Sequence, residues 1–332
     1  MNERSQSAIK STPSSGAPKT TFFMIVTPRD FPITKYTVAA LGRAVRSHDT
    51  FSAVIFCNGL SQAQIASLAG LVRKYPRLSI EDNSAYLASI RKNLQVGTFV
   101  QASGSVEERQ GFFETAPEIW SRELYRLAAE YVVMFDPDFE ILDDIFVHEI
   151  IEGLSSNNKI GFYSTNFADS RECFEIYSRE NAIIVRRFHT WFCAYRREAL
   201  EKYHDFSYFE DRSGPIPVKY DHSAMLQEVL IERHGYLGKS LSGEHADRFL
   251  HYGAFSQNRS LRGLRLWLYR LVRIGRHSGW RHKHHSAQLA RLIRKLSAIA
   301  WKLLGLGRFD SERMIHAHQV EMQRSVLEGH IA

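Results

Sequence analysis

Short apolar runs alternate with longer segments of helical spacing through the first 135 residues of the chain, and this alternation restricts the fold more than any other feature. The runs are residues 21–27, 51–59 and 131–135, a further strand that is more polar is predicted over residues 78–82, and the helical segments are residues 33–47, 61–75 and 117–130. Strands that are apolar throughout are typical of parallel sheets with helices on both faces. The repeated order of strand and helix therefore predicts an α/β fold with a mainly parallel sheet.

Polar residues accompany each of the four predicted strands. They stand at the carboxyl ends of the predicted strands: Thr27, Arg29 and Asp30 at the first, Asn58 at the second, Asp82 at the third, and Asp136 and Asp138 at the fourth. In open parallel sheets, ligands bind outside the carboxyl ends of the strands. The sequence therefore predicts a binding site at this edge of the sheet.

The segment Asp136-Pro137-Asp138 places two carboxylates one residue apart at the end of an apolar run. Like charges this close raise each other's pKa unless a cation lies between them. Mg²⁺ and Mn²⁺ prefer oxygen ligands and commonly share such a site with substrate phosphates. The alternative is a solvated acidic turn without a ligand.

The segment VVMFDPDFEIL, residues 132–142, resembles the DxD segment of GT-A fold glycosyltransferases of the broad family-2-like group. The resemblance extends over residues 20–256. It implies a Rossmann-like sheet sandwich of the GT-A type. It also implies a hexosyltransferase, expected to be inverting, that uses Mn²⁺ or Mg²⁺ to move a sugar from a nucleotide diphosphate sugar to a hydroxyl acceptor. The ion would neutralise the diphosphate leaving group.

The same resemblance implies roles for individual residues. The nucleotide would contact residues at the ends of the strands: Thr27, Arg29, Asp30, Asn58, Asp82 and Asp136. Asn58 stands where the family commonly has an aspartate, and Asp82 is the candidate that compensates. The metal ligands would be Asp136, Asp138 and a late histidine, for which His251 is the first candidate and His245 the competitor.

The acceptor side is implied by two later segments. Asp221 opens a predicted helix where the family carries its general base, although an N-cap role explains that position equally well. His189 and Trp191 resemble residues that line the acceptor side. Trp191 is also compatible with a place in the apolar core.

A strongly basic segment follows the predicted catalytic domain. Residues 248–308 contain 14 Lys or Arg and no Asp or Glu, whereas the whole chain has a net charge of +7. Its helical spacing predicts basic amphipathic helices that lie on anionic lipid or pack on the rest of the chain. We therefore predict a disordered tail over residues 1–20, a GT-A catalytic domain over 21–256 and a basic helical extension over 257–332.

Compartment and partners follow from the same features. The chain contains no run of 18 apolar residues and no apolar leader, and its three cysteines form no CxxC pair. We expect reduced thiols in a cytoplasmic protein, with the membrane's cytoplasmic face as a peripheral site. The expected partners are a nucleotide-sugar donor and a glycan or lipid-linked acceptor of surface polysaccharide synthesis.

Two other functions stay open at this point. A nucleotidyltransferase of related architecture would also use aspartates and a metal, but TPRDFPITK, residues 27–35, lacks the glycine-rich loop of that class. A nucleic-acid-binding protein would use the basic segment. That second alternative is disfavoured because it leaves the two aspartates unexplained and because the remaining chain is acidic.

Overall fold

The computed structural model describes most of the chain between residues 18 and 251. The gaps within this range are residues 29, 87–115, 166–174, 180–181, 187, 189, 208, 212, 214–216, 221–222, 242–244 and 246–247. The predicted tail, except residues 18–20, and the predicted basic extension over 257–332 lie outside the described residues. The division into three regions therefore stays a prediction.

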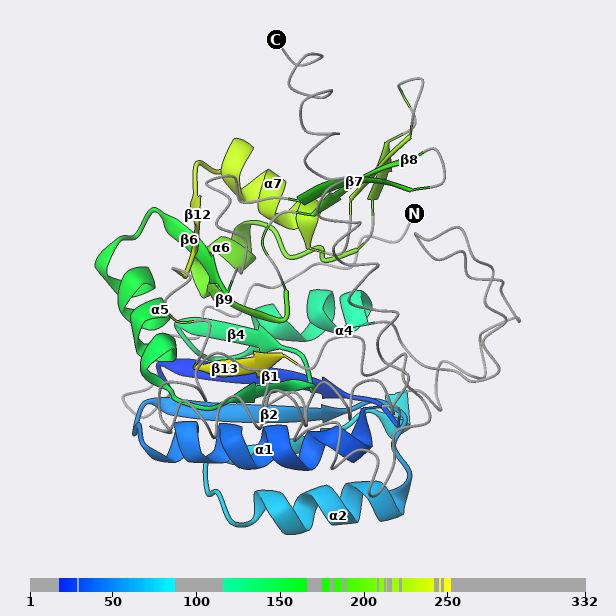
Figure 1. The fold of residues 1–332 in the computed structure, drawn as a ribbon, viewed down its shortest axis with the longest axis vertical. Helices are drawn as coiled ribbons and strands as arrows, with labels where there is room; N and C mark the ends of the chain where they lie inside the picture. The colour runs from blue at the N-terminus through cyan, green and yellow to red at the C-terminus, as the bar shows by residue number, and fades with distance from the viewer. Residues whose placement is uncertain are drawn as a thin grey trace, which may run out of the picture.

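A seven-stranded sheet forms the centre of the molecule (Figure 1). In spatial order its strands are β12 (Leu237–Ser240), β6 (Ile160–Ser164), β9 (Phe192–Arg196), β4 (Tyr131–Phe135), β1 (Thr20–Val26), β2 (Phe51–Cys57) and β3 (Leu78–Asp82). Neighbouring strands are parallel except around β9, which runs antiparallel to both β4 and β6. The predicted α/β fold with a mainly parallel sheet is confirmed.

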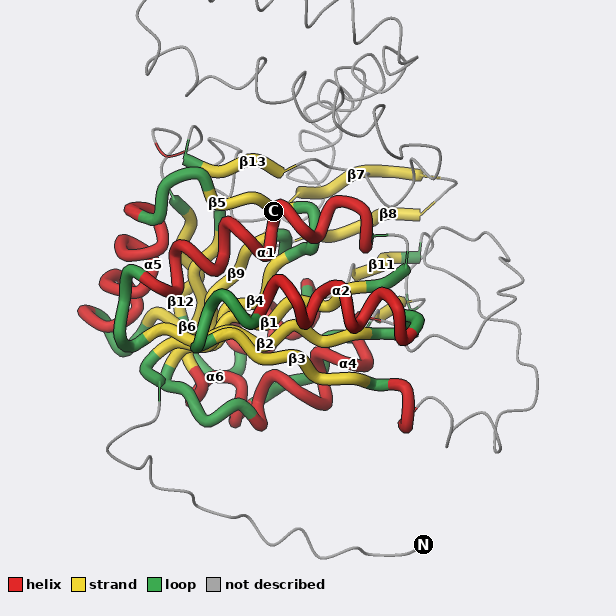
Figure 2. Tube along the Cα trace, turned by 90° about the horizontal axis from the view of Figure 1, so that it is seen from below, coloured by secondary structure: helices red, strands yellow, loops and turns green. Residues whose placement is uncertain are grey.

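Helices cover both faces of this sheet. One face packs against α1 (Phe31–Arg46), α2 (Gln62–Val72) and α5 (Ile145–Ser156), and the other against α4 (Ala116–Glu123), α6 (Arg197–Lys202) and α7 (Ala224–Glu232). Figure 2 shows α1 and α2 lying in front of the strands on the first face, and Figure 1 shows that they run alongside β2. This two-sided burial explains why β1 and β4 are buried at every position and why both are apolar, apart from Thr20 and Thr21 at the start of β1.

Two of the predicted helices are confirmed nearly in full. Ser61 is the N-cap of α2, and it forms a capping box with Gln64. The predicted helix 117–130 is shorter. It ends at Glu123, one 3₁₀ turn follows as η1 (Leu124–Arg126), and Leu127 is extended. The chain needs this extended stretch to turn back into β4 at Tyr131.

Two smaller sheets complete the described fold. One contains β10 (Phe209–Asp211), β11 (Val218–Tyr220), β8 (Ala182–Arg186) and β7 (Glu175–Arg179), in that order. In the other, β5 (Phe139–Ile141) pairs antiparallel with β13 (Phe249–His251), so that residue 251 lies opposite residue 139. This pairing brings a late segment of the chain beside the end of β4.

Two further observations concern the described part of the chain. Cys57 and Cys193 are buried thiols without a disulfide, and burial raises the pKa of each to about 12. Cys173 lies outside the described residues. No helix in the described ranges is long and apolar enough to cross a bilayer.

Candidate metal and nucleotide site at the carboxyl ends of the strands

The two aspartates lie in a tight turn between β4 and β5. The backbone N–H of Asp136 donates to the carbonyl of Trp191 at 2.8 Å, and the N–H of Phe139 donates to the carbonyl of Asp136 at 3.1 Å. From α1, the Thr37 hydroxyl donates to the carbonyl of Pro137 at 2.7 Å. One bond closes the turn, and the other two hold it against α1 and against the residue that precedes β9.

The structure brings His251 to these carboxylates. Its Nε2 lies 3.3 Å from Oδ1 of Asp138 and 3.6 Å from Oδ2 of Asp136. The side chains of His251 and Asp138 are 10% and 11% exposed, whereas that of Asp136 is 32% exposed. One oxygen or nitrogen of each residue lies within 4.8 Å of the other two. This spacing is suitable for three ligands of a single ion, with Asp136 on the side that faces solvent.

The charges of the three groups depend on one another. Burial alone would lower the pKa of His251, but the neighbouring Asp138 and Asp136 carboxylates raise it to about 9. Without a metal, the protonated imidazole is therefore the cation that the two acids require. A divalent ion at this point would displace that proton, because a metal ligand must be a neutral imidazole.

Aromatic rings fix the orientation of the imidazole. Trp191 stacks on His251, with ring centroids 4.3 Å apart and planes 20° apart. On the core side, Phe139 stacks on Phe249 with a centroid distance of 4.9 Å. Trp191 was predicted from the sequence to line the acceptor side, and the structure places its ring against the candidate metal ligand. This stacking could not be predicted from the sequence, because residues 191 and 251 come together only through the pairing of β13 with β5.

Thr27 and Asp30, two predicted nucleotide contacts, lie at the same edge of the sheet. The Thr27 hydroxyl donates to Oδ2 of Asp30 at 2.6 Å. Burial is the main cause that raises the pKa of Asp30 to about 6; repulsion from Asp138 and Asp136 adds to it, and Thr27 partly offsets it. Asp30 is therefore close enough to Asp136 and Asp138 for their negative charges to repel its own.

The ends of β2 and β3 contribute two buried amides. Asn58 is 2% exposed, and Asn83, which directly follows β3, is 4% exposed. The Asn83 side-chain N–H donates to Oδ1 of Asn58 at 3.5 Å. Asp82 is exposed, and its Oδ1 accepts from the backbone and hydroxyl of Ser84. Asn83 was not among the predicted site residues, although its position directly after a strand was a usable signal.

The structure also separates the two histidine candidates. His245 lies 2.5 Å from a carboxylate oxygen of Glu149 on α5, rather than beside the aspartate pair. His251 alone of the two reaches Asp136 and Asp138. Three other predicted site residues, Arg29, His189 and Asp221, lie outside the described residues.

The known proteins that resemble this chain are solved structures of low sequence identity. No protein-family model and no curated protein matches the chain. A mannosyltransferase from Pyrobaculum calidifontis, solved with GDP-Man and Mn²⁺, is 13% identical and covers 97% of this chain and 89% of its own, with a TM-score of 0.46. Glucosyl-3-phosphoglycerate synthase from Mycobacterium tuberculosis, solved with Mn²⁺ and UDP, is 12% identical, with coverages of 78% and 80% and a TM-score of 0.40.

A third similar structure belongs to another class of enzyme. It is 4-diphosphocytidyl-2C-methyl-D-erythritol synthase from Anaerococcus prevotii, 10% identical, with coverages of 76% and 98% and a TM-score of 0.40. All three scores are below 0.5. The assignment of a function to this chain therefore rests on its own residues.

Proposed function

We propose that this chain is a metal-dependent glycosyltransferase that transfers a sugar from a nucleotide diphosphate sugar to a hydroxyl acceptor. The observation that carries the proposal is the group of Asp136, Asp138 and His251 outside the carboxyl end of β4. The segment that contains the two aspartates resembles the DxD segment of GT-A glycosyltransferases. The fold agrees, because ligands of parallel sheets bind at this edge.

The donor set fits Mn²⁺ or Mg²⁺. Two carboxylates are hard ligands for either ion, and the imidazole of His251 favours Mn²⁺ over Mg²⁺. A bound ion would neutralise negative charge on the diphosphate as the bond to the sugar breaks. Asp138 and His251 would hold it from the buried side, and Trp191 would keep the imidazole ring in place. Asp136, the more exposed ligand, would face the incoming nucleotide.

The ends of the other parallel strands then provide the nucleotide side of the site. Thr27 and Asp30 follow β1, and the Asn58–Asn83 pair follows β2 and β3. Amide and hydroxyl groups at these positions can hydrogen-bond a base or a ribose. Asp82 is the weaker candidate, because its carboxylate already accepts from Ser84 in an exposed turn.

The remaining parts of the proposal concern the acceptor and the place of the enzyme in the cell. Asp221 is the proposed general base of an inverting hexosyl transfer, and His189 the proposed acceptor contact. The proposed acceptor is a growing surface polysaccharide or a lipid-linked glycan. The basic segment beyond residue 256 would hold the enzyme on anionic lipid at the cytoplasmic face of the membrane.

The first experiment is calorimetry of the full chain with Mn²⁺ and a panel of nucleoside diphosphates. We expect one diphosphate to bind only in the presence of the metal, and Asp138→Ala to weaken that binding by about 100-fold or more, since the ion would lose a buried ligand. Asp205→Ala is the matched control. It removes an exposed aspartate whose carboxylate accepts a local backbone N–H from Ser207.

Two other results would change the assignment. If the chain consumes a nucleoside triphosphate and a sugar phosphate and releases pyrophosphate, it is the nucleotidyltransferase of the alternative. If no nucleotide binds with or without metal, the glycosyltransferase proposal is wrong. Nucleic-acid binding that survives Asp138→Ala would then assign the function to the basic segment.

A further inference from the structure

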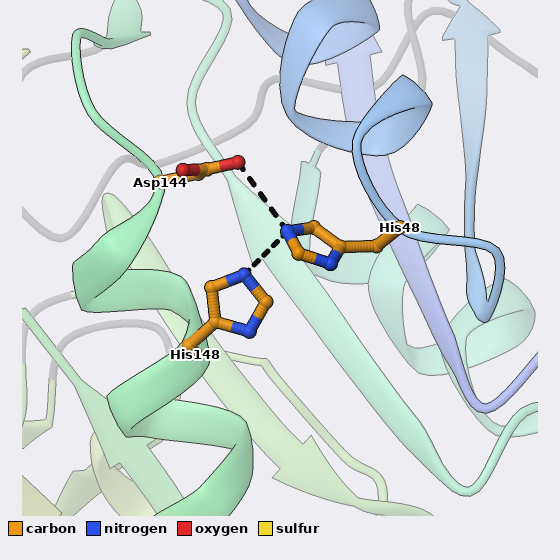
Figure 3. A group of neighbouring side chains, drawn as sticks. All are labelled: His48, Asp144 and His148. Atoms are coloured by element: carbon orange, nitrogen blue, oxygen red, sulfur yellow. Dashed lines mark hydrogen bonds and ion pairs between the residues drawn. The ribbon is translucent and has the colours of Figure 1, made fainter.

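A second group of metal-ligating side chains lies near the opposite edge of the sheet. It consists of His48, Asp144 and His148 (Figure 3). His48 lies between the end of α1 and the start of β2, Asp144 is the N-cap residue of α5, and His148 lies in the first turn of α5. Strand β2 runs from Phe51, beside His48, to Cys57, beside Asn58. Its seven residues span about 20 Å, so this group is separate from the aspartate pair.

The distances in this group match those between ligands of one ion. Nε2 of His48 lies 3.4 Å from Oδ2 of Asp144, and the three donor atoms all lie within 4.8 Å of one another. Two ligands of a tetrahedral zinc ion, each 2.0–2.1 Å from the metal, are about 3.3 Å apart. The Nε2 atoms of His48 and His148 are in hydrogen-bond contact. A small rotation of either ring would open this contact to the zinc spacing.

Neighbouring groups orient all three side chains. The Ser47 hydroxyl lies 2.7 Å from Oδ2 of Asp144 and donates to it. The ring of Phe51 stacks on His148 with planes 23° apart, and its centroid lies 4.8 Å from that of His48. The side chains of His48 and Asp144 are 27% and 30% exposed, so an ion can reach them from solvent. The site is thus both held in place and accessible.

The donor types distinguish this group from the first one. Two imidazoles and one carboxylate are ligands that suit Zn²⁺, with a fourth position left for water. Two carboxylates and one imidazole beside a phosphate ligand suit Mn²⁺. The simpler alternative for the second group is an imidazole–imidazole hydrogen bond with an ion pair to Asp144 and no metal.

We propose that His48, Asp144 and His148 form a binding site for Zn²⁺ or a similar divalent transition metal. The ion would join the end of α1 to the start of α5, two helices that cover the same face of the sheet. An ion that binds only the folded chain adds its binding free energy to the stability of that chain. The site would therefore act as a structural clamp, separate from the transfer reaction.

The test uses full-length protein in which competing ligands are removed. Asp138→Asn disables the aspartate pair, and His282→Gln, His284→Gln and His285→Gln remove the histidine cluster of the basic segment. Equilibrium dialysis against Zn²⁺ with elemental analysis then counts the bound ions. We expect one Zn²⁺ per chain and a higher Tm in its presence. His148→Gln in this background should weaken binding by tenfold or more.

Two controls make the result specific. His204→Gln removes a histidine next to α6, on the other face of the sheet, and should leave zinc binding unchanged. If His148→Gln fails to fold, Asp144→Asn replaces it, because asparagine retains the side-chain size and the Asp144 side chain makes no cap hydrogen bond to α5 that could be lost. With Co²⁺ in place of Zn²⁺, the strong visible absorption of a four-coordinate ion should appear in the background protein and be lost in either ligand variant.

The proposal is overturned by either of two outcomes. One is that the background protein binds no Zn²⁺, which would leave the pair of imidazoles as an ordinary hydrogen bond. The other is that zinc binding and the Co²⁺ spectrum persist unchanged in both His148→Gln and Asp144→Asn. Neither outcome depends on nucleotide binding, so the proposed transferase function is tested independently.

Discussion

The two groups of metal-ligating residues differ in place, donor type and burial. The first lies at the carboxyl ends of the parallel strands, has two acids and one histidine, and is largely buried. The second lies at the amino end of β2 and has two histidines and one acid. Its His48 and Asp144 side chains are 27% and 30% exposed, whereas those of His251 and Asp138 in the first group are 10% and 11% exposed. Open parallel sheets bind ligands at the carboxyl edge, where the first group lies. The comparison suggests one ion for chemistry and one for holding two helices together.

The largest expected effect is the loss of stability when the phenylalanine packed beside each group is truncated. Phe139 and Phe51 are both buried, and truncation of either to alanine should lower the free energy of unfolding by about 3–5 kcal/mol in urea titrations. Phe139→Ala should also weaken Mn²⁺ binding, because Phe139 packs against Phe249 beside His251. Phe51→Ala should instead weaken Zn²⁺ binding. If each variant impairs both metals equally, the two groups are not independent sites.

Asp30 offers a test of the charge at the first group. Its pKa is raised from 3.8 to about 6, so the group's destabilisation of the folded, metal-free protein grows between about pH 4 and pH 6 and stays constant above pH 6. Asp30→Asn should therefore stabilise the chelator-treated protein by about 2 kcal/mol at pH 8, and have almost no effect at pH 4. Thermal unfolding at both pH values measures this. A stabilisation that is the same at pH 4 would show that ionisation is not its cause.

His251 should determine how strongly Mn²⁺ binds and how the affinity depends on pH. A pKa of about 9 means that Mn²⁺ must displace a proton at neutral pH, so the affinity should rise as the pH is raised towards 9. His251→Gln should bind Mn²⁺ about tenfold more weakly at pH 9 and with a flatter pH profile. His245→Gln is the control, since His245 pairs with Glu149. If only His245→Gln lost Mn²⁺ affinity, His245 and not His251 would be the metal ligand.

The smallest effect is expected at Ser47, beside the second group. Its hydroxyl contacts both Asp144 and the carbonyl of Ala44, and Ser47→Ala should cost about 0.5–1 kcal/mol of stability. Zinc affinity should fall less than in His148→Gln, because Ser47 only orients a ligand. Ser155→Ala removes a similar hydroxyl, bonded to a backbone carbonyl at the other end of α5, and should leave zinc affinity unchanged. Equal zinc affinity in wild type and Ser47→Ala would show that this hydroxyl does not position Asp144.

The sequence was informative where the relevant residues are neighbours along the chain. Apolar runs predicted β1, β2 and β4, the place of LSIED after a helical segment predicted β3, and the aspartates directly after β4 indicated the first group. Antiparallel β9, inserted between β4 and β6, was not predicted, because an apolar run does not reveal the direction in which a strand runs.

Contacts between distant residues were not predictable in the same way. His48 is separated from Asp144 and His148 by about 100 residues, so no spacing marks the second group. The stacking of Trp191 on His251 and the pairing of Asn58 with Asn83 likewise depend on strand order. The resemblance to GT-A enzymes favoured His251 over His245 by position, and only the β5–β13 register showed which imidazole reaches the acids.

The β5–β13 pairing also determines when, during synthesis of the chain, the proposed metal site becomes complete. Residues 20–240 contain every strand of the central sheet and both aspartates, but the imidazole arrives only with the three residues of β13. A nascent chain that has emerged only as far as β12 would therefore have its acids in place without their third ligand. If the chain binds Mn²⁺ as proposed, tight binding would begin only after residue 251 has left the ribosome. Binding of the ion would therefore follow synthesis of all strands of the central sheet.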